Sequence, residues 1–409
     1  MSKINDLIKE LCPNGVIFKK LDEACTKIYA GGTPSTSHEE YYGGNIKWLR
    51  SGEINFNELY DTEIKITDAG LNNSSAKIIP SHSVVIAMTG ATVARTAMIM
   101  EDMSMNQSVC ALIPKDELNY RFLYQLLSNK YLELKQSGQG VLTSLNLDRI
   151  KKITLPVPPL EVQEEIVRIL DKFGELEAEL EAELEARKSQ YEFWREKLLN
   201  DDNLVTIGDL LEDKGYIRGP FGSALVKADM VSEGIPVYEQ QHAIYNHRNF
   251  RYFISLDKAK KLERFSIKPN DLIISCSGTV GKVSVISDND PKGIINQALL
   301  ILRLNKKLIM PKYMKYYLES PVGYRSITSN TNKSAQVNIA NRETIEKIKI
   351  SVPSLEHQKH IVNILDKFDA LVNDISEGLP AEIELRRKQY EYYRNKLLNF
   401  KVQSIYEEN

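Results

Sequence analysis

The sequence predicts an α+β protein in which two mixed α/β globules alternate with two long helices. Three observations predict this class: an internal duplication, apolar residues at helical spacing after each globule, and short β-branched runs between turn residues. With 409 residues, 42% of them apolar and 26% charged, the chain has the composition of a globular protein of more than one domain.

The duplication is read from two blocks of the sequence. Val157–Phe173 matches Val352–Phe368 at 12 of 17 positions, with a constant offset of 195. Gln190–Asn200 then matches Gln389–Asn399 at eight of 11 positions, with an offset of 199. The second copy therefore carries four additional residues between the two blocks, and the two halves of the chain derive from one unit.

Both repeat blocks of a copy are predicted to lie on one long helix. Apolar or aromatic residues recur every three or four positions, as at Ile166, Ile169 and Phe173 in the first copy. A Pro-x-Leu pattern precedes each helix and predicts an extended entry, because residues before proline avoid helical angles. Gly378 and Pro380 fall inside the second pattern, so we expect that helix to kink or break there.

Between the helices, the pattern is mixed. Runs such as Ser83–Ala87 and Leu272–Ser275 alternate with turns rich in Gly, Asn, Ser and Pro, which predicts two globules. We divide the chain into a first globule with a short N-terminal helix (1–155), a first repeated helix (156–203), a second globule (204–350), a second repeated helix (351–400) and a C-terminal tail (401–409).

Net charge differs strongly between these segments. The whole chain has a net charge of −2, but the first globule is neutral, the first helix carries −8, the second globule +8 and the remainder −2. An acidic helix thus masks a basic globule. A charge of +8 favours a polyanionic partner such as nucleic acid, whereas the neutral first globule gives no such indication.

Targeting and cysteine patterns favour a cytoplasmic protein. No apolar run approaches the length of a membrane span, and the N-terminus lacks the apolar core of a signal peptide. Four cysteines, Cys12, Cys25, Cys110 and Cys276, lie far apart without a CxxC pair. This spacing argues against a zinc site and against a disulfide framework.

Catalytic motifs are missing from the pattern. The stretch Cys276–Lys282 resembles a phosphate-binding loop, but it lacks the first glycine and has Val283 where a hydroxyl should follow. No Asn/Asp-Pro-Pro-aromatic motif of amino-methyltransferases occurs. His357 and His360 are spaced for one helix face, yet Val162 and Glu165 stand at the equivalent positions of the first copy. We therefore expect the two histidines to be polar residues on the helix surface and not metal ligands. We expect a non-catalytic chain without a metal or cofactor of its own.

The arrangement resembles the specificity subunits of type I restriction–modification systems. Its most specific parts are the repeated L/V-P-x-L-E-x-Q…I-V-x-I-L-D-K-F and R-x-x-Q-Y-E-x-x-R-x-K-L-L-N blocks. Gly31–Ser35 followed by Ile46–Arg50 looks like the family's opening of a target recognition domain. Gly219–Ser223 and Gly234–Val237 resemble the equivalent stretch of the second globule.

This resemblance implies a fold and a set of partners. Two target recognition globules would lie in a pseudo-two-fold arrangement, separated by two antiparallel helices that form a coiled-coil spacer. Each globule would read one half of a bipartite double-stranded DNA target. The helices would set the gap and dock two adenine-methylating modification subunits, which would carry S-adenosylmethionine, and two restriction subunits could join; no membrane is involved.

Residues that read DNA are expected in polar loops, where Arg pairs with guanine, Asn or Gln with adenine, and Thr with the thymine methyl group. Arg218, Arg248 and Arg251 are expected to contact phosphates, which position without specifying. In the first globule the candidates are Thr33, Ser35, Lys47, Trp48, Arg50, Thr89, Thr92, Arg95 and Gln107, with Trp48 equally compatible with the core. In the second they are Ser223, Gln240, Gln241, His242, Ser277, Thr279, Lys282, Gln297, Asn332 and Lys333.

Residues 175–186 are three tandem copies of Glu-Leu-Glu-Ala. This segment is a solvated helix by composition, and we interpret it further as a ruler for the gap between half-sites. Two alternatives to DNA recognition remain at this stage. A pure coiled-coil assembly scaffold explains the helices but not the matched turns of the globules, and an independent methyltransferase or nuclease is disfavoured by the missing motifs.

Overall fold

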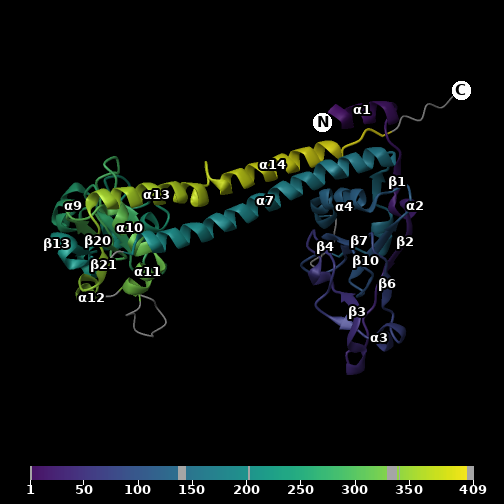
Figure 1. Cartoon of the computed structure of the whole chain (residues 1–409), viewed down its shortest axis with the longest axis horizontal. Coiled ribbons are helices and arrows are strands. Elements are labelled where there is room, and N and C mark those ends of the chain that lie inside the picture. The colour runs from purple at the N-terminus through teal and green to yellow at the C-terminus, as the bar shows by residue number, and fades with distance from the viewer. Residues whose placement is uncertain (1, 137–143, 201–202, 329–338, 340, 403–409) are drawn as a thin grey trace. The chain divides into compact units, whose positions relative to one another are not determined.

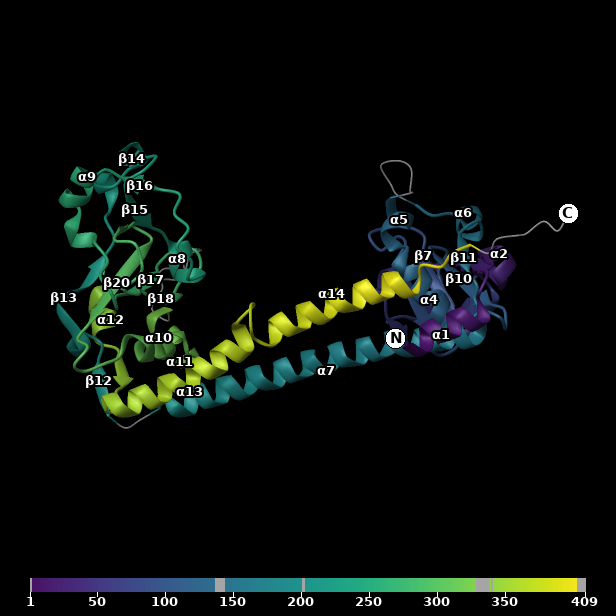
Figure 2. The same cartoon turned by 90° about the horizontal axis from the view of Figure 1, so that it is seen from above.

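The computed structural model describes residues 2–136, 144–200, 203–328, 339 and 341–402. Its internal contacts group into two compact units, the first formed by Met1–Glu179 with Ile383–Asn409 and the second by Leu180–Glu382. Each unit contains one globule and parts of both repeated segments (Figures 1 and 2). The five segments predicted from the sequence are each continuous in the chain, whereas the first compact unit is not, because each repeated segment contributes to both units.

The first globule is built on three sheets. They have the strand orders β2-β10-β7-β8-β4, β5-β3-β9-β6 and β1-β11. Its strands are β1 (Phe18–Lys20), β2 (Cys25–Ala30), β3 (Tyr42–Leu49), β4 (Glu58–Leu59), β5 (Lys65–Ile66), β6 (Lys77–Ile79), β7 (Ser83–Ala87), β8 (Thr96–Ile99), β9 (Met103–Met105), β10 (Val109–Pro114) and β11 (Thr154–Pro156). Its helices are α1 (Ser2–Leu11), α2 (Leu21–Ala24), α3 (Asp68–Asn72), α4 (Tyr120–Asn129), α5 (Tyr131–Gln136) and α6 (Leu147–Lys151).

The second globule also has three sheets, with the strand orders β13-β20-β17-β18, β14-β16-β15-β19 and β12-β21. Its strands are β12 (Leu204–Thr206), β13 (Leu211–Arg218), β14 (Met230–Val231), β15 (Ile235–Tyr238), β16 (Phe253–Ile254), β17 (Leu272–Ser275), β18 (Val283–Val285), β19 (Ile294–Ile295), β20 (Leu299–Leu304) and β21 (Lys349–Ser351). Its helices are α8 (Gln240–Ile244), α9 (Leu256–Lys261), α10 (Pro311–Glu319), α11 (Pro321–Thr328) and α12 (Arg342–Glu346).

The two globules share one internal topology. The order β2-β10-β7-β8 corresponds to β13-β20-β17-β18, and β5-β3-β9 corresponds to β16-β15-β19. Equivalent strands also pair in the same direction, because β3 is parallel to β9 and β15 is parallel to β19. Topology therefore confirms the duplication in the parts of the chain where the sequences have diverged most.

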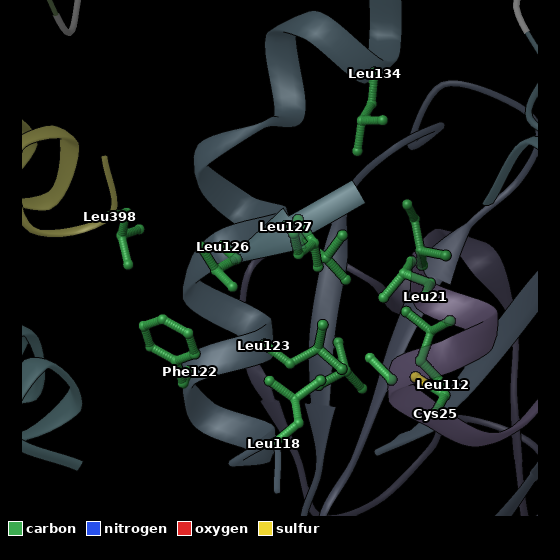
Figure 3. Close-up of a cluster of buried hydrophobic side chains, with 14 of the residues drawn as sticks. Leu21, Cys25, Leu112, Leu118, Phe122, Leu123, Leu126, Leu127, Leu134 and Leu398 are labelled. Atoms are coloured by element: carbon green, nitrogen blue, oxygen red, sulfur yellow. The ribbon is translucent and has the colours of Figure 1, made fainter. Parts of the chain in front are cut away.

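The core of the first unit joins segments that are far apart in the sequence. Figure 3 shows leucines of α4 packed beside Leu112 of β10 and Leu21 of α2. Leu398, which follows the last long helix, belongs to the same cluster. Asn119 starts α4 by accepting hydrogen bonds from two backbone amides of its first turn, which satisfies donors that a helix leaves unpaired.

The first repeated segment forms one helix of 39 residues, α7 (Leu160–Leu198). In the first unit, α14 (Leu379–Leu397) runs antiparallel to the first part of α7, with Phe173 against Tyr390 and Tyr393 at ring distances of 6.3 and 5.5 Å. An ion pair between Glu177 and Arg387 extends the same contact. In the second unit, α13 (Leu355–Asn373) packs on the last part of α7, where Tyr191 meets Phe368 at 6.1 Å.

The predicted break in the second helix is confirmed. Helix α13 ends at Asn373, and α14 begins at Leu379, which places Pro380 in a first turn, where proline is tolerated. Asp374 Oδ1 accepts hydrogen bonds from the backbone amides of Ser376 and Glu377, and this turn interrupts the helix. Because α13 and α14 have 19 residues each, the interruption absorbs the four additional residues of the second copy and leaves its helical length close to that of α7.

A repeated glutamine fastens each globule to its long helix. Gln163 Oε1 accepts from the Asn119 amide at 2.8 Å, and its Nε2 donates to the carbonyl oxygens of Glu117 and Pro158 at 2.8 and 2.7 Å. Gln358 makes the same three bonds, from the Met310 amide and to Leu308 and Pro353, at 2.8, 3.0 and 2.8 Å. Both side chains are fully buried. This part of the repeat therefore serves the interior of each unit.

Helix α1 explains the largest difference between the two copies. It packs on the first unit next to Val162, which is buried, and Lys3 pairs with Glu165 at 3.1 Å. The hydrogen bond from Arg168, together with that from Lys3, lowers the pKa of Glu165 to about 2 despite its burial. The equivalent His357 and His360 are exposed in the second unit. Within the described residues, no group of three or more His, Cys, Asp or Glu side chains is placed to hold a metal ion.

The segment that follows α1 and the segment that follows α14 meet in the first unit. Val16 forms a parallel bridge with Val402, and its amide donates to the Lys401 carbonyl at 2.9 Å. The next residue, Ile17, accepts a hydrogen bond from the Val157 amide at 2.9 Å, and in the second unit Asn203 accepts from the equivalent Val352 amide at 2.9 Å. Across the described residues, none of the helices has both the length and the apolar character required to cross a bilayer.

Candidate nucleic-acid interface

Four loops of the first globule meet where strands β2, β3, β7 and β9 end. Backbone hydrogen bonds join them: Gly31 N donates to Val109 O at 3.4 Å, Asn106 N to Leu49 O at 2.9 Å, and Met88 N to Ser108 O at 2.8 Å. We call this surface the first edge and define it by residues 31–35, 50–55, 88–95 and 106–108. It brings together loops that are separated by up to about half of the globule's sequence.

The second globule repeats the arrangement bond for bond. Gly219 N donates to Leu299 O at 3.0 Å, Asn296 N to Tyr238 O at 2.9 Å, and Cys276 N to Ala298 O at 2.9 Å. The second edge is defined by residues 219–223, 239–242, 276–282 and 296–298, which follow β13, β15, β17 and β19. Matching turns in the two sequences thus correspond to matching backbone positions.

Two pairs of equivalent residues show why the turns are alike. Asn106 Oδ1 accepts from the Ser108 amide at 3.1 Å, and Asn296 Oδ1 accepts from the Ala298 amide at 3.0 Å. A Cβ atom on Gly31 would lie 2.0 Å from Met105 O, and one on Gly219 would lie 1.9 Å from Asn296 O. Glycine is therefore required where the first loop passes the fourth, and asparagine braces the turn beside it.

Seven of the nine candidates in the first globule lie on the first edge. Thr33 donates to Gln107 Oε1, and both residues are exposed. Thr92 Oγ1 donates to Ser51 O at 2.8 Å, which ties the third loop to the second. The seven residues are Thr33, Ser35, Arg50, Thr89, Thr92, Arg95 and Gln107.

The two arginines of the first edge are partly held by neighbours. Arg95 Nη1 donates to Asn55 Oδ1 at 2.9 Å. Arg50 pairs with Glu63 and keeps 40% of its side chain exposed. Both side chains are thereby oriented while part of each guanidinium surface stays open to a ligand.

Lys47 and Trp48 do not join the first edge. Trp48 is buried, and its indole N–H donates to Gly32 O at 3.0 Å. A residue that reads a base must be accessible, so the prediction that Trp48 contacts DNA is wrong. Trp48 belongs to the core, which was the alternative that the sequence left open. Lys47 Nζ donates to the Tyr60 carbonyl at 2.6 Å and pairs with Glu101, both outside the four loops. The Lys47 side chain keeps 20% of its surface exposed, and its contact with DNA stays a prediction.

Seven candidates of the second globule lie on the second edge. Ser277 Oγ donates to Gln240 Oε1 at 3.3 Å, which joins the second and third loops as Thr92 does in the first globule. Lys282 and Gln297 are exposed, whereas Gln240 and Gln241 are half-buried. The seven residues are Ser223, Gln240, Gln241, Ser277, Thr279, Lys282 and Gln297.

His242 and Arg248 have structural roles. His242 is fully buried, with Nδ1 2.8 Å from the Glu239 amide and Nε2 3.1 Å from Asn249 O. Arg248 Nε donates to Asp290 at 2.8 Å and Nη1 to the His247 carbonyl at 3.0 Å. Because His242 is buried, the prediction that it contacts DNA is wrong. Arg248 keeps 18% of its side chain exposed, and its contact with a phosphate stays a prediction. The predicted readers Asn332 and Lys333 lie outside the described residues.

The two remaining arginines differ in exposure. Arg218 is half-buried at the end of β13, with its guanidinium 5.8 Å from the Phe221 ring centroid. Arg251 is 65% exposed and makes two hydrogen bonds with Glu239, at 2.8 and 2.9 Å. Those hydrogen bonds raise the pKa of Arg251 further above its usual value, so its charge is permanent.

A cluster that sequence reasoning missed borders the first edge. Lys135 Nζ donates to the Tyr131 hydroxyl at 3.0 Å, and the Tyr131 ring meets Phe56 at 5.1 Å. The hydrogen bond from Lys135, and after it one from Arg95, lowers the pKa of Tyr131. No local pattern marks these residues, because α5 reaches the second and third loops only through the fold.

The chemistry of both edges is that of recognition. Hydroxyl and amide groups occur on both edges, with the guanidinium groups of Arg50 and Arg95 on the first and the ammonium group of Lys282 on the second. These are groups that hydrogen-bond base edges and phosphates. Cys276, the one thiol on an edge among the described residues, is buried, and burial raises its pKa to about 12. A thiol with that pKa is not a nucleophile at neutral pH.

Comparisons with known proteins agree with this geometry. The family model for the type I restriction modification DNA specificity domain matches twice, over residues 13–186 and 203–385. A Haemophilus influenzae protein named as a type I restriction enzyme specificity subunit is 34% identical over 305 residues, which cover 72% of this chain and 76% of that protein. The EcoR124I/EcoR124II specificity subunit of Escherichia coli is 32% identical over 265 residues, or 61% of this chain and 63% of the relative.

Solved structures show the same fold at lower identity. One chain from a structure of a type I restriction–modification system superimposes with a TM-score of 0.64 at 17% identity, over 95% of this chain and 98% of that one. The HsdS subunit of Thermoanaerobacter tengcongensis gives a TM-score of 0.55 at 17% identity, over 95% and 97% of the two chains.

Proposed function

The chain belongs to the type I restriction–modification DNA specificity family, as the repeat blocks predicted, and from this premise we propose that its two edges each read one half of a bipartite double-stranded DNA target. In this proposal the chain is the non-catalytic specificity subunit of an adenine-specific methyltransferase and restriction complex. S-adenosylmethionine is bound by the modification subunits and no cofactor by this chain.

One observation carries the proposal. The same backbone hydrogen bonds hold four loops together in each globule, while the exposed side chains on those loops differ. A constant backbone with exchangeable polar side chains is what two independent readers of different sequences require. A scaffold without DNA recognition would not need two matched sets of loops.

The readout follows from the chemistry of the loops. Exposed Thr and Gln side chains can contact thymine methyl groups and adenine edges, and Arg can pair with guanine. Lys282 and the positive balance of the second globule add attraction to phosphates. The first globule is neutral overall, so its DNA contact depends on Arg50, Arg95 and the adjacent Lys135.

Partner docking is supported by repeated residues that the interior does not use. Phe193 and Tyr392 are equivalent, and each is 60% exposed. Lys197 lies 5.9 Å from the Phe193 ring centroid, and Lys396 lies 6.0 Å from that of Tyr392. An exposed aromatic ring with a lysine beside it thus occurs once in each unit, next to globules that have diverged. One partner that binds twice accounts for this retention.

A hollow continues this surface in each unit. In the second unit it is lined by Leu199, Asn200, Leu204 and Tyr317, among others. In the first unit, the equivalent hollow is lined by Leu398, Asn399, Phe18 and Leu126, among others. The repeated Leu-Asn pair contributes to both, so a side chain of the same modification subunit can enter either one.

The proposal is tested by assaying adenine methylation of genomic DNA. The chain alone is expected to be inactive, as is the modification subunit alone, whereas the mixture should methylate a bipartite motif. Methylation by this chain alone would refute the non-catalytic role. Methylation by the mixture without a sequence motif would refute the reading of DNA by the edges.

Docking is tested by shortening the two exposed aromatic side chains. We expect Phe193→Ala and Tyr392→Ala each to reduce the bound modification subunits from two to one, and the double variant to bind none, as measured by native mass spectrometry. Ile375→Ala is the matched control, since Ile375 is exposed and apolar but has no repeated aromatic counterpart. Two bound subunits in the double variant would place docking elsewhere.

The gap between half-sites is tested through the Glu-Leu-Glu-Ala repeats of α7. Deleting Glu175–Ala178 shortens the helix by about 6 Å at 1.5 Å per residue, which is under two base-pair steps of about 3.4 Å. We expect the methylated motif to keep both half-sites and to lose one or two base pairs of its gap. An unchanged gap in methylation-site mapping would contradict the ruler interpretation.

A further inference from the structure

The residue that follows β3 in the first globule and the residue that follows β15 in the second occupy the same position on the two edges. Strand β3 pairs in parallel with β9 through Trp48 and Leu49, and β15 pairs in parallel with β19 through Val237 and Tyr238. The next amide across the edge, of Asn106 or Asn296, donates to the last strand carbonyl at 2.9 Å in both globules. Arg50 and Glu239 are therefore equivalent.

Their partners are equivalent as well. Trp48 N donates to Ile64 O at 3.1 Å, and Val237 N donates to Tyr252 O at 2.9 Å. The residue before each of these carbonyl residues is Glu63 in the first globule and Arg251 in the second. The first globule thus has Arg50 paired with Glu63, and the second has Glu239 paired with Arg251. The same ion pair is present twice with its charges exchanged.

In each globule, a third residue accepts a hydrogen bond from the backbone of the ion pair. Glu53 Oε1 accepts from the Arg50 amide at 3.1 Å, and its Oε2 accepts from the Glu63 amide at 2.9 Å. His242 Nδ1 lies 2.8 Å from the Glu239 amide at the same place in the second globule. Glu53 therefore holds the backbone of both paired residues in the first globule, and His242 holds the backbone of Glu239 in the second.

The exchange changes which strand presents the arginine. In the first globule, Arg50 extends from the end of β3 and is 40% exposed. In the second, the carboxylate of Glu239 is 9% exposed, and Arg251, which precedes β16, is 65% exposed. Each globule thus has one arginine fixed by a carboxylate: Arg50 lies on the first edge, and Arg251 lies beside the second edge, held by Glu239.

We propose that Arg50 and Arg251 each read a guanine in their half-site, and that Glu63 and Glu239 are the positioning residues that aim them. This inference rests on the proposed function, and it identifies the ion pair as a determinant of specificity. The guanidinium fork can donate two parallel hydrogen bonds to guanine O6 and N7. A carboxylate that already holds the fork reduces the rotamer freedom lost on binding, and this sharpens discrimination.

The inference assigns Arg251 a base contact in place of the phosphate contact expected from the sequence. The two contacts differ in what their loss does: loss of a phosphate contact weakens binding to all sequences alike, whereas loss of a base contact relaxes selection at one base pair. The two hydrogen bonds from Glu239 fix the plane of the Arg251 guanidinium, and Gln241 Nε2 donates to the same carboxylate at 3.3 Å. Such orientation matters for reading a base edge.

The experiment maps methylated genomic sites for the full chain with its modification subunit. We expect Arg251→Gln to relax the motif about tenfold or more at one G·C pair of the second half-site and nowhere else. Arg50→Gln should do the same in the first half-site. Glu239→Gln should weaken selection at the same base pair as Arg251→Gln, and Glu239→Asp should restore part of it, which a purely structural role would not produce.

A double variant that exchanges the two charges distinguishes an effect on DNA recognition from an effect on folding. The variant with both Glu239→Arg and Arg251→Glu retains an ion pair in the arrangement that the first globule already accommodates, so we expect thermal unfolding close to that of the wild type together with a changed second half-site. Arg264→Gln, at an exposed arginine outside the edge, is the control and should leave the motif unchanged.

Each outcome has a distinct meaning. If the wild-type complex methylates no defined motif, the proposed function fails. If the wild type has a bipartite motif that Arg50→Gln and Arg251→Gln leave intact while both variants remain folded, only this inference fails. A changed A·T pair, or a change in the opposite half-site, would likewise overturn the assignment of these arginines to guanine.

Discussion

The two globules differ in side chains far more than in backbone. Gly31, Leu49 and Asn106 of the first have direct counterparts in Gly219, Tyr238 and Asn296 of the second, with the same backbone donors and acceptors. At the adjoining positions, Arg50 is replaced by Glu239 and Glu53 by His242. The backbone hydrogen bonds of the edge are therefore the same in both globules, whereas the charged and hydrogen-bonding side chains on the edge differ.

Loss of the repeated glutamine should have the largest effect on the stability of each unit. Removing either side chain leaves a buried amide and two buried carbonyl groups without their partner. We expect Gln163→Ala and Gln358→Ala each to lower the free energy of unfolding by about 2–4 kcal/mol. Urea unfolding measures the loss, and limited proteolysis should show that each variant opens its own unit first.

The neighbouring exposed residue provides the control for the glutamine variants. Glu164→Ala should leave the unfolding midpoint within experimental error, because Glu164 is exposed on α7. If Gln163→Ala unfolds at the wild-type urea concentration, the repeated glutamine does not fasten the globule to the helix.

A pH difference between the two globules is the next expected effect. Burial lowers the pKa of His242 below its ordinary value of 6.5, and the neutral ring holds the Glu239 amide. The stability that this group contributes is therefore fully present above pH 6.5 and is lost as the pH falls through the lower pKa of the folded state. In the first globule the equivalent amide, that of Arg50, is held by Glu53, so no histidine contributes to its pH dependence.

The measurement is the stability of each unit between pH 7 and pH 5. One proton limits the slope to about 1.4 kcal/mol per pH unit. His242→Gln should flatten the decline in the second unit, since an amide can accept and donate without titrating. An equal decline in the wild type and in this variant would show that His242 does not govern the pH response.

The smallest effect concerns one position of the third loop. Ala94 has a φ of 67°, and the equivalent Gly281 has a φ of 81°. We expect Ala94→Gly to change stability by less than about 0.5 kcal/mol, because relief of the left-handed conformation offsets the loss of a buried methyl group. Gly281→Ala should destabilise by about 1–2 kcal/mol, since a Cβ there would lie 3.0 Å from the Tyr324 ring.

Thermal unfolding of the two reciprocal variants checks this asymmetry. Equal and opposite changes in melting temperature would mean that the conformation alone decides the effect. A larger loss in Gly281→Ala supports the account in which packing against α11 adds to the cost.

Much of the fold was predictable because repetition and periodicity are local signals. The repeat blocks predicted the long helices, and Gly378 and Pro380 predicted the break between α13 and α14. Fourteen of the predicted DNA contacts gather on the two edges, since matched turns mark matched positions in a duplicated fold.

The remaining features depend on tertiary contacts that no local pattern contains. Trp48 and His242 are polar enough to read bases, but their neighbours bury them. Helix α1 covers Val162 in one unit alone, which the repeat could not indicate. The exchanged ion pair escaped sequence comparison because its residues are not similar; only the strand register shows that they are equivalent.

The central claim is that each globule reads its own half-site on a shared backbone arrangement. The most direct measurement is the methylated motif of a chain in which residues 204–350 are replaced by residues 18–155, the equivalent stretch from β1 to β11. The account predicts a motif whose two halves are the same, each being the first half of the wild-type target. Retention of the wild-type second half, with the hybrid folded and bound to its modification subunits, would contradict it.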